Sequence, residues 1–223
     1  MSKQLFFEAI LKFILGILII GLLLFVSSGT IAYFNGWLFM ALLFVPMLVA
    51  GIIMMIKSPN LLKSRLNAKE KEGEQKDVVK LSGLMFLIGF IIAGLNYRYG
   101  WVDIPNIIVI IGCIIFILAY MMYALVLREN MYLSRTIEVQ KDQRVIDTGL
   151  YGIVRHPMYT STIFLFLSMP LVLGSLISFI IFLIYPFIIA KRIKNEEQYL
   201  EKNLKGYIEY KKKVKYKLIP FIW

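Results

Sequence analysis

The sequence contains very few of the residues that build disulfide frameworks and metal sites. Of its 223 residues, one is cysteine and one is histidine. Cys113 has no partner for a disulfide, and alone it cannot supply a thiolate metal site. It lies inside an apolar run, where we expect a small buried side chain. The sequence therefore predicts no disulfide and no metal centre.

Several patterns typical of other protein classes are also missing. There is no Gly-rich strand–helix fingerprint of a dinucleotide-binding domain. There are no segments of about ten residues in which apolar and polar side chains alternate, as an outer-membrane barrel requires. Basic patches interleaved with aromatic residues are absent, so we expect no nucleic-acid binding. No internal repeat of the kind found in many transporters is present.

Long apolar runs dominate what is there. Hydrophobic residues make up 59% of the chain, and the mean hydropathy is +0.74. A run of about 20 apolar residues is long enough to cross a bilayer, and it must be helical because unpaired backbone groups are costly in hydrocarbon. The first run is longer than the apolar part of a signal peptide, and no small-residue cleavage site clearly follows. The first four predicted spans are Leu5–Val26, Trp37–Ile56, Leu81–Tyr97 and Ile107–Leu127.

Residues 157–190 form a further apolar stretch without a single charge. These 34 residues are too many for one ordinary span and too few for two full spans with a generous loop. Pro170 and the Gly174-Ser175 pair lie near the middle and favour a turn. We predict a tight helical hairpin of two short legs. The predicted fold is an all-α, polytopic transmembrane helical bundle with about six membrane segments.

The basic residues predict the orientation of this bundle. The chain has 25 Lys and Arg against 14 Asp and Glu. Segment 57–80 holds seven of these basic residues, segment 128–156 holds five, and the tail from Lys191 holds ten. Only Arg98 falls on the opposite side. The positive-inside rule therefore predicts cytoplasmic termini and cytoplasmic long loops, where the basic residues meet anionic membrane lipids.

This topology divides the chain into two parts. Residues 1–127 are predicted to form four transmembrane helices with a cytoplasmic loop at 57–80. Residues 128–223 are predicted to hold the hairpin at 157–190 and a C-terminal cytoplasmic helix. The first four spans carry almost nothing ionisable in their central turns, whereas a transporter or channel usually places acids or bases there.

The chemically capable residues gather on either side of the hairpin. Before it, Arg155 and His156 directly precede Pro157, a residue well suited to the first turn of a helix. After it, Arg192 and Glu196 are four residues apart and share one helical face. Each group alone also fits an interfacial anchor or an intrahelical ion pair. Because a hairpin returns the chain to the same membrane face, we expect the two groups to meet, as a functional site requires.

Together these residues resemble the isoprenylcysteine carboxyl methyltransferase family and the wider phospholipid N-methyltransferase group. The resemblance covers roughly residues 128–223, and the first hundred residues match only as generic spans. One departure is Ser161, where many relatives carry glycine. The matching pattern is Gly149-x-Tyr151, Arg155-His-Pro-x-Tyr159, the apolar hairpin, Arg192-x-x-x-Glu196-Glu197-x-x-Leu200, and the ending Tyr207-x-x-Tyr210…Val214…Pro220.

The resemblance implies a membrane-embedded enzyme that uses S-adenosyl-L-methionine and has its active site on the cytoplasmic face. It also implies a cofactor pocket covered by the C-terminal helix. Glu196 would hold the polar end of the cofactor, and Arg192 would face the methyl acceptor. Glu197 or His156 would be the candidate base if the acceptor is an amine. The implied cofactor-binding residues are Val145, Ile146, Tyr151, His156, Pro157, Met158, Tyr159 and Glu196.

The acceptor is expected to be lipid-like, and its reaction stays open at this point. Arg192 favours carboxyl O-methylation of a prenylated thioether acid, because a guanidinium orients a carboxylate through two hydrogen bonds. N-methylation of a phospholipid headgroup is the alternative within the same class. Membrane sterol reductases, which use NADPH, carry a comparable Arg-His-Pro-x-Tyr, and a non-enzymatic membrane protein is the third alternative. The sequence does not indicate the oligomeric state.

Overall fold

The computed structural model describes residues 3–67, 73–134 and 136–223, excluding the side chains of 73–75. Each of the first four apolar runs lies in one helix, and the run 157–190 is divided among three. The described residues are helical or irregular and contain no strand, which confirms the all-α prediction. Five helical segments are long and apolar enough to cross a membrane. They are α1 (Lys3–Ser28), α2 (Phe34–Lys57), α4 (Gly73–Tyr99), α5 (Asn106–Glu129) and the consecutive pair α7 (Leu176–Phe182) and α8 (Tyr185–Asn203).

The exposed surfaces of these helices are apolar, as a lipid environment requires. In the most apolar window of α1, only 6% of the residues are buried inside the molecule, against 39% in the window of Leu176–Asn203. Helix α1 therefore lies at the periphery, and the segment of α7 and α8 is more deeply packed than α1. The core contains fully buried aromatic rings, including Phe39, Phe116 and Phe182.

The predicted hairpin is present, and its two legs differ in length. Its first leg, α6 (Pro157–Val172), starts with Pro157 in the first turn. The chain then reverses at Gly174, whose φ of +74° suits a residue without a Cβ. Ser175 caps α7 by accepting a hydrogen bond from the Ser178 amide. The second leg does not stop at Ala190, because α8 continues without a break from the apolar part into the polar part.

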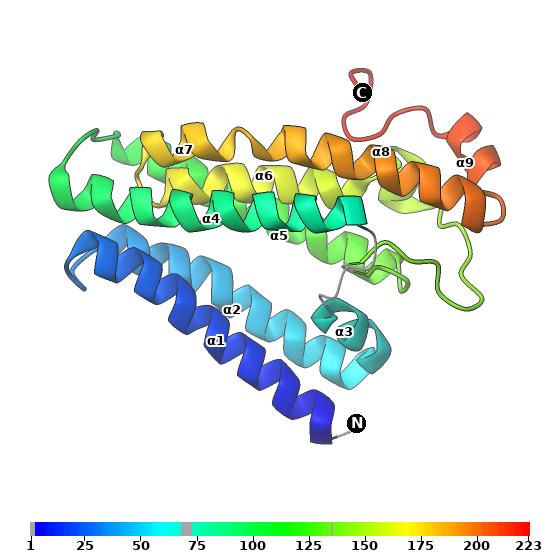
Figure 1. Cartoon of the computed structure of the whole chain (residues 1–223), viewed down its shortest axis with the longest axis horizontal. Helices are drawn as coiled ribbons and strands as arrows, with labels where there is room; N and C mark the ends of the chain where they lie inside the picture. The colour runs from blue at the N-terminus through cyan, green and yellow to red at the C-terminus, as the bar shows by residue number, and fades with distance from the viewer. Residues whose placement is uncertain (1–2, 68–72, 135) are drawn as a thin grey trace.

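Both termini lie at the same end of the bundle (Figure 1). The loop between α5 and α6 and the short helix α9 (Tyr207–Lys213) lie at this end too, whereas the turns after α1, α4 and α6 lie at the other. The two predicted polar groups therefore reach the same end. The exact number of spans and the cytoplasmic position of this end stay predictions.

Segment 57–80 is more ordered than a plain connecting loop. It contains α3 (Pro59–Leu66), which begins with Pro59 directly after α2, and the first residues of α4. Leu61 and Leu62 of α3 are buried. Residues 68–72, also part of the predicted loop, lie outside the described residues. Helix α3, within this segment, is therefore packed against the bundle.

Candidate functional site

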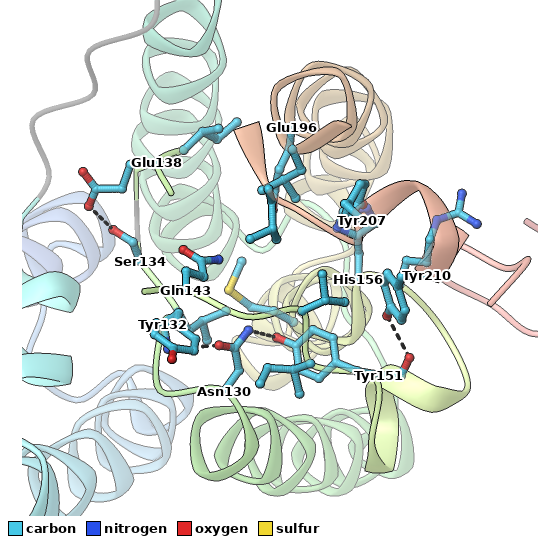
Figure 2. A pocket seen from close by; sticks show the side chains of 18 of the residues that line it. Asn130, Tyr132, Ser134, Glu138, Gln143, Tyr151, His156, Glu196, Tyr207 and Tyr210 are labelled. Carbon is cyan, nitrogen blue, oxygen red and sulfur yellow. Dashed lines mark hydrogen bonds between the residues drawn. The ribbon is translucent and has the colours of Figure 1, made fainter. Parts of the chain in front are cut away.

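A pocket opens where the loop after α5, the start of α6 and the end of α8 meet (Figure 2). The space inside it is about 820 Å³, and part of this space is open to solvent. Helix α9 closes it from one side. The residues that line it are Asn130, Tyr132, Leu133, Ser134, Thr136, Ile137, Glu138, Gln143, Arg144, Val145, Ile146, Tyr151, Arg155, His156, Met158, Tyr159, Arg192, Glu196, Leu200, Leu204, Tyr207 and Tyr210.

The pocket wall formed by the residues just before α6 is attached to the end of α5 at Gly149 and Leu150. Gly149 opens the short helix η1 (Gly149–Gly152) with a φ of +50°. The neighbouring Leu150 amide donates a hydrogen bond of 3.1 Å to Glu129 Oε2. A Cβ at position 149 would lie 1.6 Å from Glu129 Oε1. The positive φ therefore favours glycine, and a Cβ here would displace the Glu129 carboxylate from its hydrogen bond with Leu150.

Tyr151 is held from two directions. Its hydroxyl accepts a hydrogen bond of 3.0 Å from Asn130 Nδ2, and its carbonyl accepts one of 2.7 Å from the Tyr210 hydroxyl (Figure 2). Burial raises the pKa of Tyr151, because desolvation disfavours the phenolate. The pocket thus has a neutral aromatic wall whose position depends on α5 and on α9.

Tyr159 joins the two predicted polar groups. Its hydroxyl donates a hydrogen bond of 2.5 Å to Glu196 Oε2 and accepts one of 2.8 Å from Arg192 Nε. Arg192 and Glu196 are one turn apart on α8, so both reach this hydroxyl from the same face. All three side chains line the pocket. The expected meeting of the two groups across the hairpin is therefore present.

Glu197 faces a different set of partners. Its Oε1 accepts a hydrogen bond of 2.7 Å from Arg155 Nε and lies 3.3 Å from His156 Nε2. Lys217 Nζ lies 3.5 Å from its Oε2. The side chains of Arg155 and Glu197 are each only 6% exposed. Glu197 does not line the pocket, whereas Arg155 and His156 do.

The remaining predicted site residues fall into place around this arrangement. Val145, Ile146 and Met158 line the pocket and supply apolar surface. Pro157 is fully buried in the first turn of α6 and does not line the pocket. Its fixed backbone orients the neighbouring His156 and Met158.

The C-terminal tail forms a backbone strap across Arg155 and His156. Arg155 Nη1 donates to the carbonyls of Val214 and Lys215 at 2.8 Å each. The Arg155 backbone amide donates a hydrogen bond of 2.9 Å to the Tyr216 carbonyl, and the His156 backbone amide donates one of 2.9 Å to the Lys217 carbonyl. The only indication in the sequence that this tail belongs to the site is its resemblance to the ending of the family pattern. No local signal marks the strap, because it consists mainly of backbone carbonyls.

The loop after α5 contributes a polar wall to the pocket that was not predicted from the sequence. Ser134 Oγ donates a hydrogen bond of 3.2 Å to Glu138 Oε1, and Gln143 and Tyr132 lie beside them (Figure 2). The only available signal was the density of polar residues between 130 and 144, which is equally typical of a solvated loop.

Tyr207 provides a test of whether the pocket suits a polar cofactor. Its hydroxyl is buried at the pocket wall and has no hydrogen-bond partner among the described residues. A buried polar atom without a partner carries a desolvation cost that a bound ligand removes. A carboxylate (Glu196), aromatic walls and apolar side chains accompany it. This donor and acceptor set fits a ligand such as S-adenosylmethionine, which combines charged, aromatic and apolar parts.

Comparison with known proteins agrees with this geometry over the region that builds most of the pocket. Residues 108–202 match the isoprenylcysteine carboxyl methyltransferase (ICMT) family. This match confirms the family resemblance over α5, the hairpin and α8 and supports a membrane methyltransferase. The predicted site residues from Val145 to Glu197 all lie inside the ICMT match.

A curated protein shows a more distant similarity. The Delta(14)-sterol reductase TM7SF2 of Mus musculus is 30% identical over 91 residues. These residues are 40% of this chain and 22% of the reductase, so the chain matches about a fifth of that relative's length. The similarity makes a reductase the weaker alternative.

Proposed function

We propose that this protein is an integral membrane methyltransferase that transfers a methyl group from S-adenosylmethionine to a lipid-like acceptor. The observation that carries the proposal is the contact of Tyr159 with both Glu196 and Arg192 inside a pocket built mainly by the ICMT-matching region. By the positive-inside rule, this end of the bundle faces the cytoplasm.

The cofactor would be held by residues of both polar groups. It supplies a methyl group on a positively charged sulfur. Glu196 would accept hydrogen bonds from the polar end of the cofactor, and the Tyr207 hydroxyl would gain its missing partner. Val145, Ile146 and Tyr151 would contact the adenosine part. His156, Met158 and Tyr159 would form the remaining wall, and the buried Pro157 would hold the backbone between them in place.

Methyl transfer of this kind depends mainly on alignment. It is an in-line displacement, so holding the two reactants in position supplies much of the acceleration. A carboxylate acceptor is already nucleophilic and needs no general base. Arg192, itself held by Tyr159, would orient that carboxylate, and the covering helix α9 would exclude water. We therefore favour carboxyl O-methylation.

Glu197 has a positioning role in this proposal. It lies outside the pocket lining, and its oxygens already face Arg155, His156 and Lys217. It would fix the orientation of the His156 ring rather than receive a proton from the acceptor. If the acceptor is an amine, His156 is the base candidate that faces the pocket.

The experiment is a transfer assay with methyl-labelled S-adenosylmethionine and purified protein in nanodiscs that contain either a prenyl thioether acid or phosphatidylethanolamine. Label in the prenyl acid that mild alkali releases as volatile methanol supports O-methylation. Alkali-stable label in the phospholipid supports N-methylation. Oxidation of NADPH with a sterol substrate, without label transfer, would support the reductase alternative instead.

A further inference from the structure

Helix α3 reaches the site from the N-terminal half of the chain, outside the region that matches ICMT. Leu61 of α3 packs in one buried cluster with Val126, Leu133 and Tyr151. At the other end of α3, Lys12 Nζ of α1 donates a hydrogen bond of 2.7 Å to the Leu66 carbonyl. Helix α3 is therefore fixed against the wall that holds Tyr151.

Arg65 is the side chain that α3 directs at this wall. Its Nη1 donates a hydrogen bond of 3.2 Å to the Ser134 carbonyl and lies 3.9 Å from Met158 Sδ. Its Nη2 donates to the Tyr123 hydroxyl, and its guanidinium lies over the Tyr123 ring at 5.6 Å. Ser134 and Met158 both line the pocket. The guanidinium therefore contacts two residues that line the pocket, although Arg65 itself is not one of the lining residues.

The charge of Arg65 has no carboxylate partner among the described residues. Among the described residues, the guanidinium contacts a carbonyl, a thioether, a hydroxyl and an aromatic ring, all of them uncharged. The half-buried Arg65 thus differs from Arg155, which is buried but paired with Glu197. Partial burial of a cation without a counter-ion is costly, and an anion that binds beside it removes part of that cost.

We propose that Arg65 binds the anionic headgroup, a carboxylate or a phosphate, of the lipid-like acceptor. A guanidinium recognises either group through two parallel hydrogen bonds, and its several N–H groups leave donors for them. Helix α3 follows α2 directly at the end of the bundle, so an acceptor bound there keeps its apolar tail along the membrane helices. This inference rests on the proposed function, and it assigns an acceptor-side role to a residue outside the family match.

The test measures binding of matched amphiphiles to the full-length protein in neutral phosphatidylcholine nanodiscs. The pairs are farnesylthioacetic acid with its primary amide, and farnesyl monophosphate with farnesol. We expect wild type to bind at least one anion more tightly than its neutral partner, by roughly 10- to 100-fold, as for a hydrogen bond to a charged group. The pair that shows the larger preference identifies a carboxylate or a phosphate as the natural headgroup.

Arg65→Gln is expected to reduce this preference at least 5-fold, with the remainder supplied by Arg192, which also faces the acceptor. Arg65→Lys should keep more of it, because lysine retains the charge but cannot form two parallel hydrogen bonds. Lys63→Gln, which removes an exposed charge from the same helix, is the matched control and should behave as wild type. An unchanged preference in Arg65→Gln, or equal binding of anion and neutral partner by wild type, overturns the inference.

S-adenosylmethionine affinity is measured on the same samples and should be equal in wild type and all three variants. Loss of cofactor binding in wild type would refute the proposed function. The amphiphile preference is read without the cofactor, so the two failures are distinguishable. Arg65→Lys keeps the test valid if Arg65→Gln does not fold.

Discussion

Replacing Glu197 with glutamine tests the energetic role of the buried ion pairs beside the pocket. Glu197 Oε1 contacts Arg155 Nε at 2.7 Å and His156 Nε2 at 3.3 Å, and both carboxylate and guanidinium are almost inaccessible to water. Removing one partner of such a pair leaves a buried charge without compensation, at a cost of about 3–5 kcal/mol. Lys217 Nζ lies 3.5 Å from Glu197 Oε2, and the Lys217 side chain is 26% exposed, so water has some access to the Lys217 side of the cluster. We therefore expect a loss near the lower limit, about 3 kcal/mol.

The assay is reversible unfolding of the purified protein in mixed micelles with increasing SDS, which gives the free energy of unfolding for each variant. Glu201→Gln is the matched control, because Glu201 also pairs with a cation, Lys211, but both side chains are about one third exposed. An exposed pair contributes up to about 1 kcal/mol. A loss for Glu197→Gln no larger than for Glu201→Gln would refute the assignment of a stabilising buried cluster.

Two further predictions follow from individual contacts at the pocket. Gly149→Ala should lower the free energy of unfolding by more than Gly100→Ala. An added Cβ at position 149 would lie 1.6 Å from Glu129 Oε1 and displace the Glu129 carboxylate from the Leu150 amide. Gly100 also has a positive φ, but a Cβ there would have no atom within 4 Å. We expect about 1 kcal/mol for the control and at least twice that for Gly149→Ala, and equal losses would contradict the clash. Tyr207→Phe should leave the stability of the unliganded protein unchanged within about 1 kcal/mol and weaken S-adenosylmethionine binding roughly 5- to 10-fold in titration calorimetry. A destabilised protein with unchanged cofactor affinity would show that this hydroxyl has a structural role instead.

The spans, the hairpin and the contact across it could be predicted because their causes are local. Hydropathy over about 20 residues marks a span, and Gly174 marks the reversal. The four-residue spacing of Arg192 and Glu196 places both on one face of α8, where Tyr159 meets them. That one helix, α8, continues without interruption past Ala190 was harder to predict. The charged residues begin at Lys191, but they favour a helix as much as the apolar residues before them.

The rest depended on contacts between distant segments. Glu196 and Glu197 are neighbours in sequence, yet one faces the pocket and the other a set of cations, because Arg155 and the tail are placed by the tertiary fold. The strap from Val214 to Lys217 acts through backbone carbonyls, which leave no residue pattern. Arg65 lies in a segment whose charge density resembles any solvated loop, and only the packing of α3 shows its position beside the pocket.

In the proposed function, this pocket binds S-adenosylmethionine through Glu196. The most direct measurement is calorimetric titration of the cofactor into purified protein in nanodiscs, for wild type, Glu196→Gln and the control Glu201→Gln, with folding checked by the unfolding assay. We expect saturable binding to wild type and Glu201→Gln, and an affinity at least 10-fold weaker in Glu196→Gln, as for a lost hydrogen bond to a charged group. Absence of binding to folded wild type, or equal affinity in all three, would contradict it.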